Sequence, residues 1–172
     1  MIRTLVLGSL IALCAASPAL ADSATLLGVF KNWTAYQTGS GSSLTCYAMS
    51  QPRAMQPRGA KRGPIYLMVS DWPSRRIKSE PQIVPGYGYK PGGVVTLGIG
   101  GDRFNFFSRN EGTVGSAWLQ NLNDTKALMD AMSSGVSAVA IGTSQRGTRT
   151  VDTYSLAGFI DATAKIHSAC NM

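Results

Sequence analysis

Short runs of apolar and β-branched residues recur along the chain, with glycine, proline and other turn-forming residues between them. The clearest runs span residues 30–38, 44–50, 65–70, 94–99, 103–107, 117–119, 136–143 and 148–154. Many short strands with a turn about every ten residues are typical of a β-sandwich. The pattern therefore predicts a mainly β fold of about eight or nine short strands.

Two stretches late in the chain have helical periodicity. The first is a short helix near residues 124–133, where Asp124 suits the N-cap and Gly135 suits the C-terminal end. The second is an amphipathic helix near residues 156–169, for which Ser155 is the predicted N-cap. At about 100° per residue, one side of this helix carries Leu156, Phe159, Ile160, Thr163, Ile166, His167 and Cys170. Because its apolar stripe is narrow, we expect this helix to cover a core formed by the strands.

The first 21 residues have the pattern of a cleaved export signal. Arg3 precedes an apolar run over residues 5–16, and Ala19-Leu20-Ala21 fits a small-x-small cleavage site. A lipoprotein signal that uses Cys14 is the alternative, which the bulky Leu13 before it disfavours. We therefore expect cleavage after Ala21, export to the periplasm or beyond, and a mature domain of residues 22–172. No later stretch approaches the ~20 apolar residues of a transmembrane helix, so we expect no membrane span in the mature chain.

Signal removal leaves two of the three cysteines, Cys46 and Cys170. An even number of cysteines in an oxidising compartment favours a disulfide, so we predict a Cys46–Cys170 bond. Cys46 alternates in phase with Leu44 on its strand, which places it on the face expected to meet the last helix. The alternative is a pair of free, buried thiols.

The mature chain is basic, with 15 Lys and Arg against nine Asp and Glu, a formal net charge of +6. Such a balance suits an anionic partner or serves only solubility, and export disfavours nucleic acid. Two stretches hold much of the charge, and two tyrosines stand in a nearby glycine-rich loop. The candidate partner-binding residues are Arg53, Arg58, Lys61, Arg62, Arg75, Arg76, Lys78, Tyr87 and Tyr89. The alternatives are a solvated connection for the first basic stretch and a lid over a hydrophobic edge for the tyrosines.

Motifs for catalysis, cofactors and metals are not found. The single histidine, His167, falls on the apolar side of the last helix, where a half-buried structural role is expected. The chain has no G-x-S-x-G, H-E-x-x-H or C-x-x-C motif, and the glycines of residues 86–88 and 98–101 precede no helix. We predict no catalytic residue, cofactor or metal site. A periplasmic enzyme, or an enzyme inhibitor, with its site on loops at one end of the sandwich is the alternative.

These residues together resemble the invasion-associated locus B family, a group of exported alphaproteobacterial proteins. The resemblance rests on the signal segment, the early strand with Trp33, the cysteine-bearing strand, Asp71-Trp72-Pro73 after a buried strand, and Ser155-Leu156-Ala157-Gly158-Phe159 at the entry to the last helix. This sequence departs from the family at Gly115-Ser116-Ala117-Trp118, where other members carry a G-C-x-A element.

The resemblance implies an immunoglobulin-like β-sandwich, a periplasmic or surface location and no known enzymatic activity. We therefore expect an exported, non-catalytic module that binds an envelope or host-surface component, anionic or protein, with a link to host-cell interaction.

Overall fold

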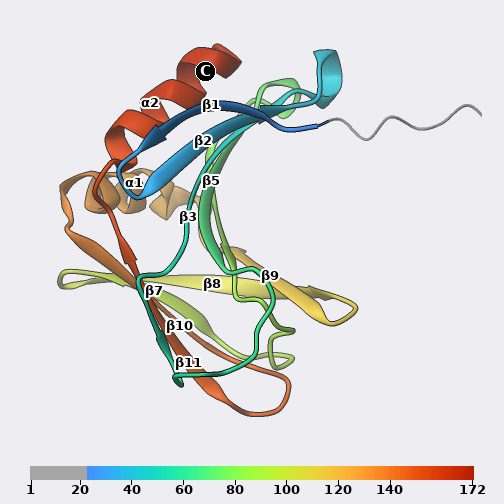
Figure 1. Cartoon of the computed structure of the whole chain (residues 1–172), viewed down its shortest axis with the longest axis vertical. Helices are drawn as coiled ribbons and strands as arrows, with labels where there is room; N and C mark the ends of the chain where they lie inside the picture. The colour runs from blue at the N-terminus through green and yellow to red at the C-terminus, as the bar shows by residue number, and fades with distance from the viewer. Residues whose placement is uncertain (1–22) are drawn as a thin grey trace, which may run out of the picture.

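The computed structural model describes residues 23–172 (Figure 1), so the predicted signal segment lies outside the described residues. Its eleven strands are antiparallel and form one sheet in the order β1-β2-β3-β5-β6-β9-β8-β7-β10-β11-β4. The strands are β1 (Thr25–Phe30), β2 (Trp33–Thr38), β3 (Thr45–Ser50), β4 (Ala54–Gln56), β5 (Tyr66–Trp72), β6 (Ile77–Val84), β7 (Val95–Ile99), β8 (Asp102–Glu111), β9 (Val114–Leu119), β10 (Ser137–Thr143) and β11 (Arg149–Ser155). The helices are α1 (Thr125–Ser134) and α2 (Phe159–Cys170), with 3-10 turns η1 (Gly41–Ser43), η2 (Pro73–Arg75) and η3 (Leu122–Asp124).

The sheet consists of two halves joined by a very short ladder. Between β6 and β9 only Gln82 pairs with Trp118 and Ile83 with Ala117. The first half consists of β1, β2, β3, β5 and β6. In Figure 1 its strands β3 and β5 run nearly vertically, whereas β8 of the second half crosses the view nearly horizontally. The predicted mainly β, sandwich-type fold is confirmed. It has eleven strands in place of eight or nine. The two halves of the sheet are the two layers of the sandwich, and the ladder between β6 and β9 connects them.

Both halves of the sheet contribute to one hydrophobic core. Alternate residues of successive strands are buried, as the two-residue period of a strand requires. Fully or almost fully buried examples are Trp33 of β2, Leu67 of β5, Leu97 of β7, Phe106 of β8 and Tyr154 of β11. Because these side chains belong to one cluster, the two halves share a core despite their short connection.

The C-terminal helix α2 lies against β1, β2, β3 and β5 and covers the first half of the sheet (Figure 1). The predicted disulfide is present and joins Cys170 of α2 to Cys46 of β3. Phe159 packs edge-on against Trp33, with ring centroids 5.0 Å apart. The prediction that Ile160 faces inward is wrong, because its side chain is 58% exposed. The buried stripe runs instead through Phe159, Ala162, Thr163, Ile166 and Cys170.

The entry to α2 differs from the prediction in one respect. Ser155 ends β11, and its Oγ accepts a hydrogen bond from the Ala157 backbone N–H at 3.3 Å. Gly158 is the N-cap instead, at a left-handed φ of 94°. A Cβ at Gly158 would lie 1.9 Å from the Phe30 carbonyl oxygen, so the turn between β1 and β2 can approach only a glycine.

Three strands fall outside the predicted set. β4 is a three-residue edge strand beside β11, within the basic stretch expected to be a connection. β6 contains Pro81, which pairs with Val69 of β5 just before the short ladder with β9 begins. β1 precedes Trp33 and pairs with β2. Within residues 23–172, no helix is long and apolar enough to cross a membrane.

Candidate functional site

A groove of about 660 Å³ lies between four loops at the end of the molecule that is lowest in Figure 1. Its walls come from residues 57–63, from the turn between β8 and β9, and from the turn between β10 and β11. Its lining residues are Pro57, Ala60, Lys61, Arg62, Gly63, Gly86, Tyr87, Gly88, Thr113, Val114, Ser144, Gln145, Arg146, Thr148 and Thr150. We refer to this cavity as the groove and to the end that carries it as the groove end.

The floor of the groove is the glycine-rich tyrosine loop, residues 85–90, which hydrogen bonds hold from several sides. Asn110 of β8 accepts from the Tyr89 backbone N–H and donates to the Tyr89 carbonyl, each at 2.8 Å. The Gly115 N–H donates to the Tyr87 carbonyl, and the Gln145 N–H donates to the Gly88 carbonyl, both at 2.9 Å. Since each contact comes from a different strand or turn, the floor is fixed in place before any ligand arrives.

Glycines make room for the two tyrosine rings below the groove. A Cβ at Gly115 would lie 2.9 Å from the Tyr89 ring, and one at Gly142 would lie 2.7 Å from it. The two tyrosine rings meet edge to face at 5.4 Å, and Tyr89 is only 2% exposed. Tyr89 therefore packs in the core. This agrees with the alternative interpretation, in which the tyrosines cover a hydrophobic edge.

Arg62 is buried in the groove wall and its charge is matched internally. Its guanidinium donates two hydrogen bonds to the Asp152 carboxylate, at 2.7 and 2.6 Å, and further bonds to the Pro85 carbonyl. The side chains are only 6% and 3% exposed. Burial by itself would lower the pKa of Arg62, but the hydrogen bonds and charge of Asp152 raise it above its ordinary value. The guanidinium also lies 5.1 Å from the centroid of the Tyr87 ring, so that it covers part of this ring.

The phenols around this ion pair are held in their neutral form. Burial raises the pKa of Tyr87, although its hydrogen bond with Thr150 Oγ1, at 2.6 Å, acts in the opposite direction. Burial also raises the pKa of Tyr89 and of Tyr154. The Tyr154 hydroxyl is buried and has no hydrogen-bond partner among the described residues.

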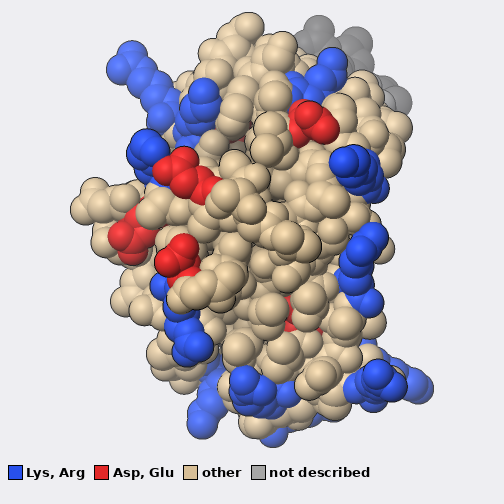
Figure 2. Space-filling model, turned by 90° about the vertical axis from the view of Figure 1, so that its left-hand side faces the viewer, with Lys and Arg blue, Asp and Glu red and all other residues tan. Residues whose placement is uncertain are grey.

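Two cations of the groove lining remain available to a ligand. Lys61 and Arg146 are exposed, come from different loops and make no hydrogen bond or ion pair with any residue of 23–172. Figure 2, which views the molecule from the left-hand side of Figure 1, shows Lys and Arg side chains along its lowest edge, with no Asp or Glu beside them. Arg146 was not among the predicted residues, although it stands in a polar turn between two predicted strands, Ser144-Gln145-Arg146-Gly147.

The two predicted basic clusters lie at opposite ends of the first half of the sheet. Tyr66 and Val84 pair at the groove end, whereas Trp72 and Ile77 pair at the far end of the same hairpin. β5 has seven residues, so the separation is roughly 20 Å. Arg75, Arg76 and Lys78 are exposed at the far end, where the Arg75 guanidinium lies 5.4 Å from the centroid of the Trp72 ring.

The remaining candidates of the first cluster are divided between two places. Arg58 is exposed in the loop that forms one groove wall. Arg53 instead lines a second cavity of about 540 Å³, with Lys31, Ser155 and Ile160. The structure therefore brings together Lys61, Arg62 and Tyr87 at the groove and leaves the other six candidates outside its lining.

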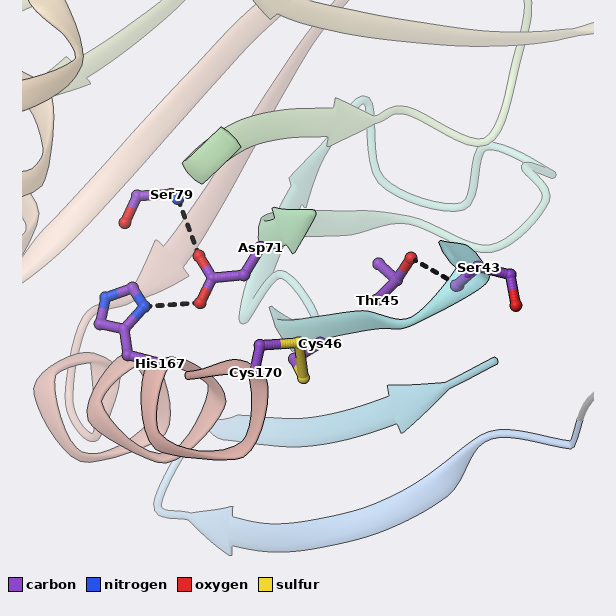
Figure 3. The surroundings of a disulfide bond; sticks show 7 residues. All are labelled: Ser43, Thr45, Cys46, Asp71, Ser79, His167 and Cys170. Carbon is purple, nitrogen blue, oxygen red and sulfur yellow. Dashed lines mark hydrogen bonds and ion pairs between the residues drawn. A yellow bond between two sulfur atoms is a disulfide. The ribbon is translucent and has the colours of Figure 1, made fainter. Parts of the chain in front are cut away.

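His167 lies far from the groove, beside the disulfide (Figure 3). Its Nδ1 is 2.6 Å from Oδ2 of Asp71, and the other Asp71 oxygen accepts a hydrogen bond from the Ser79 backbone N–H. Asp71 is fully buried and pairs in register with Cys46, so its carboxylate joins β5, β6 and α2 next to the disulfide. The predicted half-buried position of His167 is confirmed. Among residues 23–172, no group of three or more His, Cys, Asp or Glu side chains could hold a metal ion.

Comparison with known proteins gives one informative match. No protein-family model matches the chain, and no curated protein matches its sequence. The crystal structure of invasion associated protein B from Bartonella henselae is similar, with a TM-score of 0.57 over 84% of this chain and 98% of that chain, at 11% sequence identity. The likeness is therefore one of fold, and it is the fold of a protein of the family that the sequence resembles.

Proposed function

We propose that this protein is an exported, non-catalytic binding protein of the invasion-associated locus B type, and that its groove end contacts an anionic component of the envelope or of a host surface. The observation that carries the proposal is a rigid groove with two exposed, unmatched cations, Lys61 and Arg146. A fixed groove with free charges loses little conformational entropy when a ligand of opposite charge binds.

The lining of the groove supports a binding role over a catalytic one. Its described residues include no carboxylate, imidazole or thiol that could act as a general base or nucleophile. Asp152 lies behind the wall and is matched by Arg62. His167 belongs to the opposite end of the molecule, so no specific observation favours the enzyme or inhibitor alternative.

The fold and the disulfide support an extracytoplasmic location. The similar solved structure is an invasion associated protein, and the long-range Cys46–Cys170 bond suits an oxidising compartment. The predicted signal segment, residues 1–21, points the same way. A role in host-cell interaction would follow if the anionic component belongs to a host surface.

The test is sedimentation of the mature protein with vesicles of bacterial envelope or host-cell membrane, at low and at high salt. We expect binding that falls steeply as salt shortens the Debye length from about 10 Å at 0.1 M to about 3 Å at 1 M. The double substitution Lys61→Gln and Arg146→Gln should remove most of it. Arg75→Gln with Lys78→Gln is the matched control, because it removes one Lys and one Arg at the far end. Equal binding by wild type and both variants would reject the proposal.

A further inference from the structure

The chemistry of the groove lining narrows the class of ligand. Most of its side chains are polar, and its apolar ones, Pro57, Ala60 and Val114, are few and small. The Gln145 carboxamide lies over the floor, since a Cβ at Gly88 would fall 2.9 to 3.2 Å from its atoms. Thr113 and Thr148, each with a hydroxyl group, line the same space. Such a lining supplies hydrogen-bond partners for a ligand that carries many hydroxyl groups.

The aromatic residue in the lining does not offer a free stacking surface. Arg62 covers the ring of Tyr87 at 5.1 Å, and Tyr89 meets it at 5.4 Å. Nucleobases gain much of their affinity for single-strand binding proteins by stacking on open aromatic rings. A nucleotide ligand is therefore disfavoured, although its phosphates would match the two cations.

The size and shape of the groove also bear on the ligand. Its volume of about 660 Å³ exceeds what a single inorganic anion fills. Its walls come from three separate loops around a fixed floor, so an extended, polar chain fits better than the flat surface of a phospholipid bilayer. Lys61 and Arg146 stand on different walls, where they can contact separate acidic groups along such a chain.

We propose that the groove binds an acidic oligosaccharide. Lys61 and Arg146 contact its carboxylate, sulfate or phosphate groups, and the Gln145 carboxamide and the threonine hydroxyls contact its sugar hydroxyls. This inference rests on the proposed binding function and names the ligand class of the same groove.

The test is isothermal titration calorimetry of the mature protein with four soluble probes. A sulfated heparan hexasaccharide represents a host-surface source, and a phosphorylated core oligosaccharide released from lipopolysaccharide represents an envelope source. Maltohexaose supplies hydroxyls without charge, and polyglutamate supplies charge without sugar hydroxyls. We expect at least one of the two acidic saccharides to bind more tightly than maltohexaose and polyglutamate. The acidic saccharide that binds more tightly identifies the source of the ligand.

Two double variants separate recognition of charge from recognition of hydroxyls. Lys61→Gln with Arg146→Gln should lower the affinity for the acidic saccharide at least about tenfold. The control, Arg75→Gln with Lys78→Gln, should leave this affinity unchanged. Thr113→Ala with Gln145→Ala keeps every charge. It should lower the affinity for the acidic saccharide at least about fivefold and leave the affinity for polyglutamate unchanged. Circular dichroism and thermal unfolding establish that each variant is folded.

The inference is overturned if no acidic saccharide binds better than polyglutamate, or if Thr113→Ala with Gln145→Ala has no effect on saccharide binding. It is also overturned if both charge variants weaken binding equally, because net charge alone then explains it. Vesicle binding that persists in any of these cases leaves the proposed function standing, whereas loss of vesicle binding removes the proposed function itself.

Discussion

Lys61 and Arg62 are neighbours in the chain with opposite roles. Arg62 is buried against Asp152, 90 residues away, whereas Lys61 is exposed at the groove. In the sequence both are ordinary members of a basic stretch, because a buried ion pair between distant residues leaves no local pattern. The same limit applies to Tyr89, whose burial depends on the glycines of β9 and β10. Lys61 and Tyr87 could be selected from sequence, but not the partners that fix the wall around them.

Replacement of Arg62 tests the buried ion pair. Arg62→Gln leaves the Asp152 carboxylate buried without a matching charge, and we expect a loss of about 3–5 kcal/mol in the free energy of unfolding. Lys126→Gln is the control, because it removes the Lys126–Asp130 pair, which is 86% and 65% exposed, and should cost less than about 0.5 kcal/mol. Urea denaturation measures both. A small effect of Arg62→Gln would show that the wall does not depend on this pair.

The buried phenols predict a loss of stability at alkaline pH. Burial raises the folded-state pKa of Tyr87, Tyr89 and Tyr154 above the ordinary value of 10.0. The unfolded chain therefore releases these protons first. Their contribution to stability is complete below about pH 10 and is lost as the pH rises above it. Phenolate absorbance during an alkaline titration should rise in two stages, the second coinciding with unfolding. A single stage near pH 10 in the folded protein would contradict the prediction.

At the scale of elements, periodicity predicted both helices and most strands, because these follow from local patterns of burial. The strand β6 was missed because Pro81 and the basic residues before it are typical of a connection. Pro81 is tolerated where only β5 pairs with β6. The edge strand β4 depends on pairing with β11, about 95 residues later, and has no apolar alternation of its own.

The disulfide holds α2 on the sheet and can be removed without touching the groove. It closes a loop with a sequence separation of 124, for which chain entropy predicts up to about 4–5 kcal/mol. Cys170→Ser should lower the free energy of unfolding by an amount of this order and leave groove binding unchanged. Denaturation of wild type with and without reductant provides the matched comparison. Lost binding in a folded Cys170→Ser variant would contradict the separation of the two ends.

Two glycines in left-handed conformations test whether the floor of the groove is fixed. Gly86 belongs to the floor, and Gly59 belongs to the wall formed by residues 57–63. Gly86 has a φ of +74°, and a Cβ there would lie 2.4 Å from the Gly63 carbonyl oxygen. Gly59 has a φ of +73°, and a Cβ there would meet nothing within 4 Å. Gly59→Ala should cost about 1 kcal/mol from backbone strain alone. Gly86→Ala should cost more and weaken ligand binding. Equal effects of the two substitutions on stability and binding would contradict a fixed floor.

At the scale of the whole molecule, the two halves of the sheet behave as one unit because they share a core. Only two residue pairs join β6 to β9, but the buried cluster includes Leu67 of the first half and Leu97 of the second. We expect unfolding in a single cooperative transition, as is usual for chains of this size. Native-state hydrogen exchange should give similar protection free energies for the central amides of β3 and β10. Clearly different values would show that the halves open separately.

The ends of the described chain also lie together, far from the groove. Thr25 near the first described residue pairs with Gln37, which pairs with Cys46. The disulfide joins Cys46 to Cys170, near the last residue. In Figure 1 both ends lie at the top, and the groove loops lie in the lower half. A biotin tag at either end of the mature chain would therefore immobilise the protein on a sensor or glycan-array surface with Lys61 and Arg146 directed toward the solution.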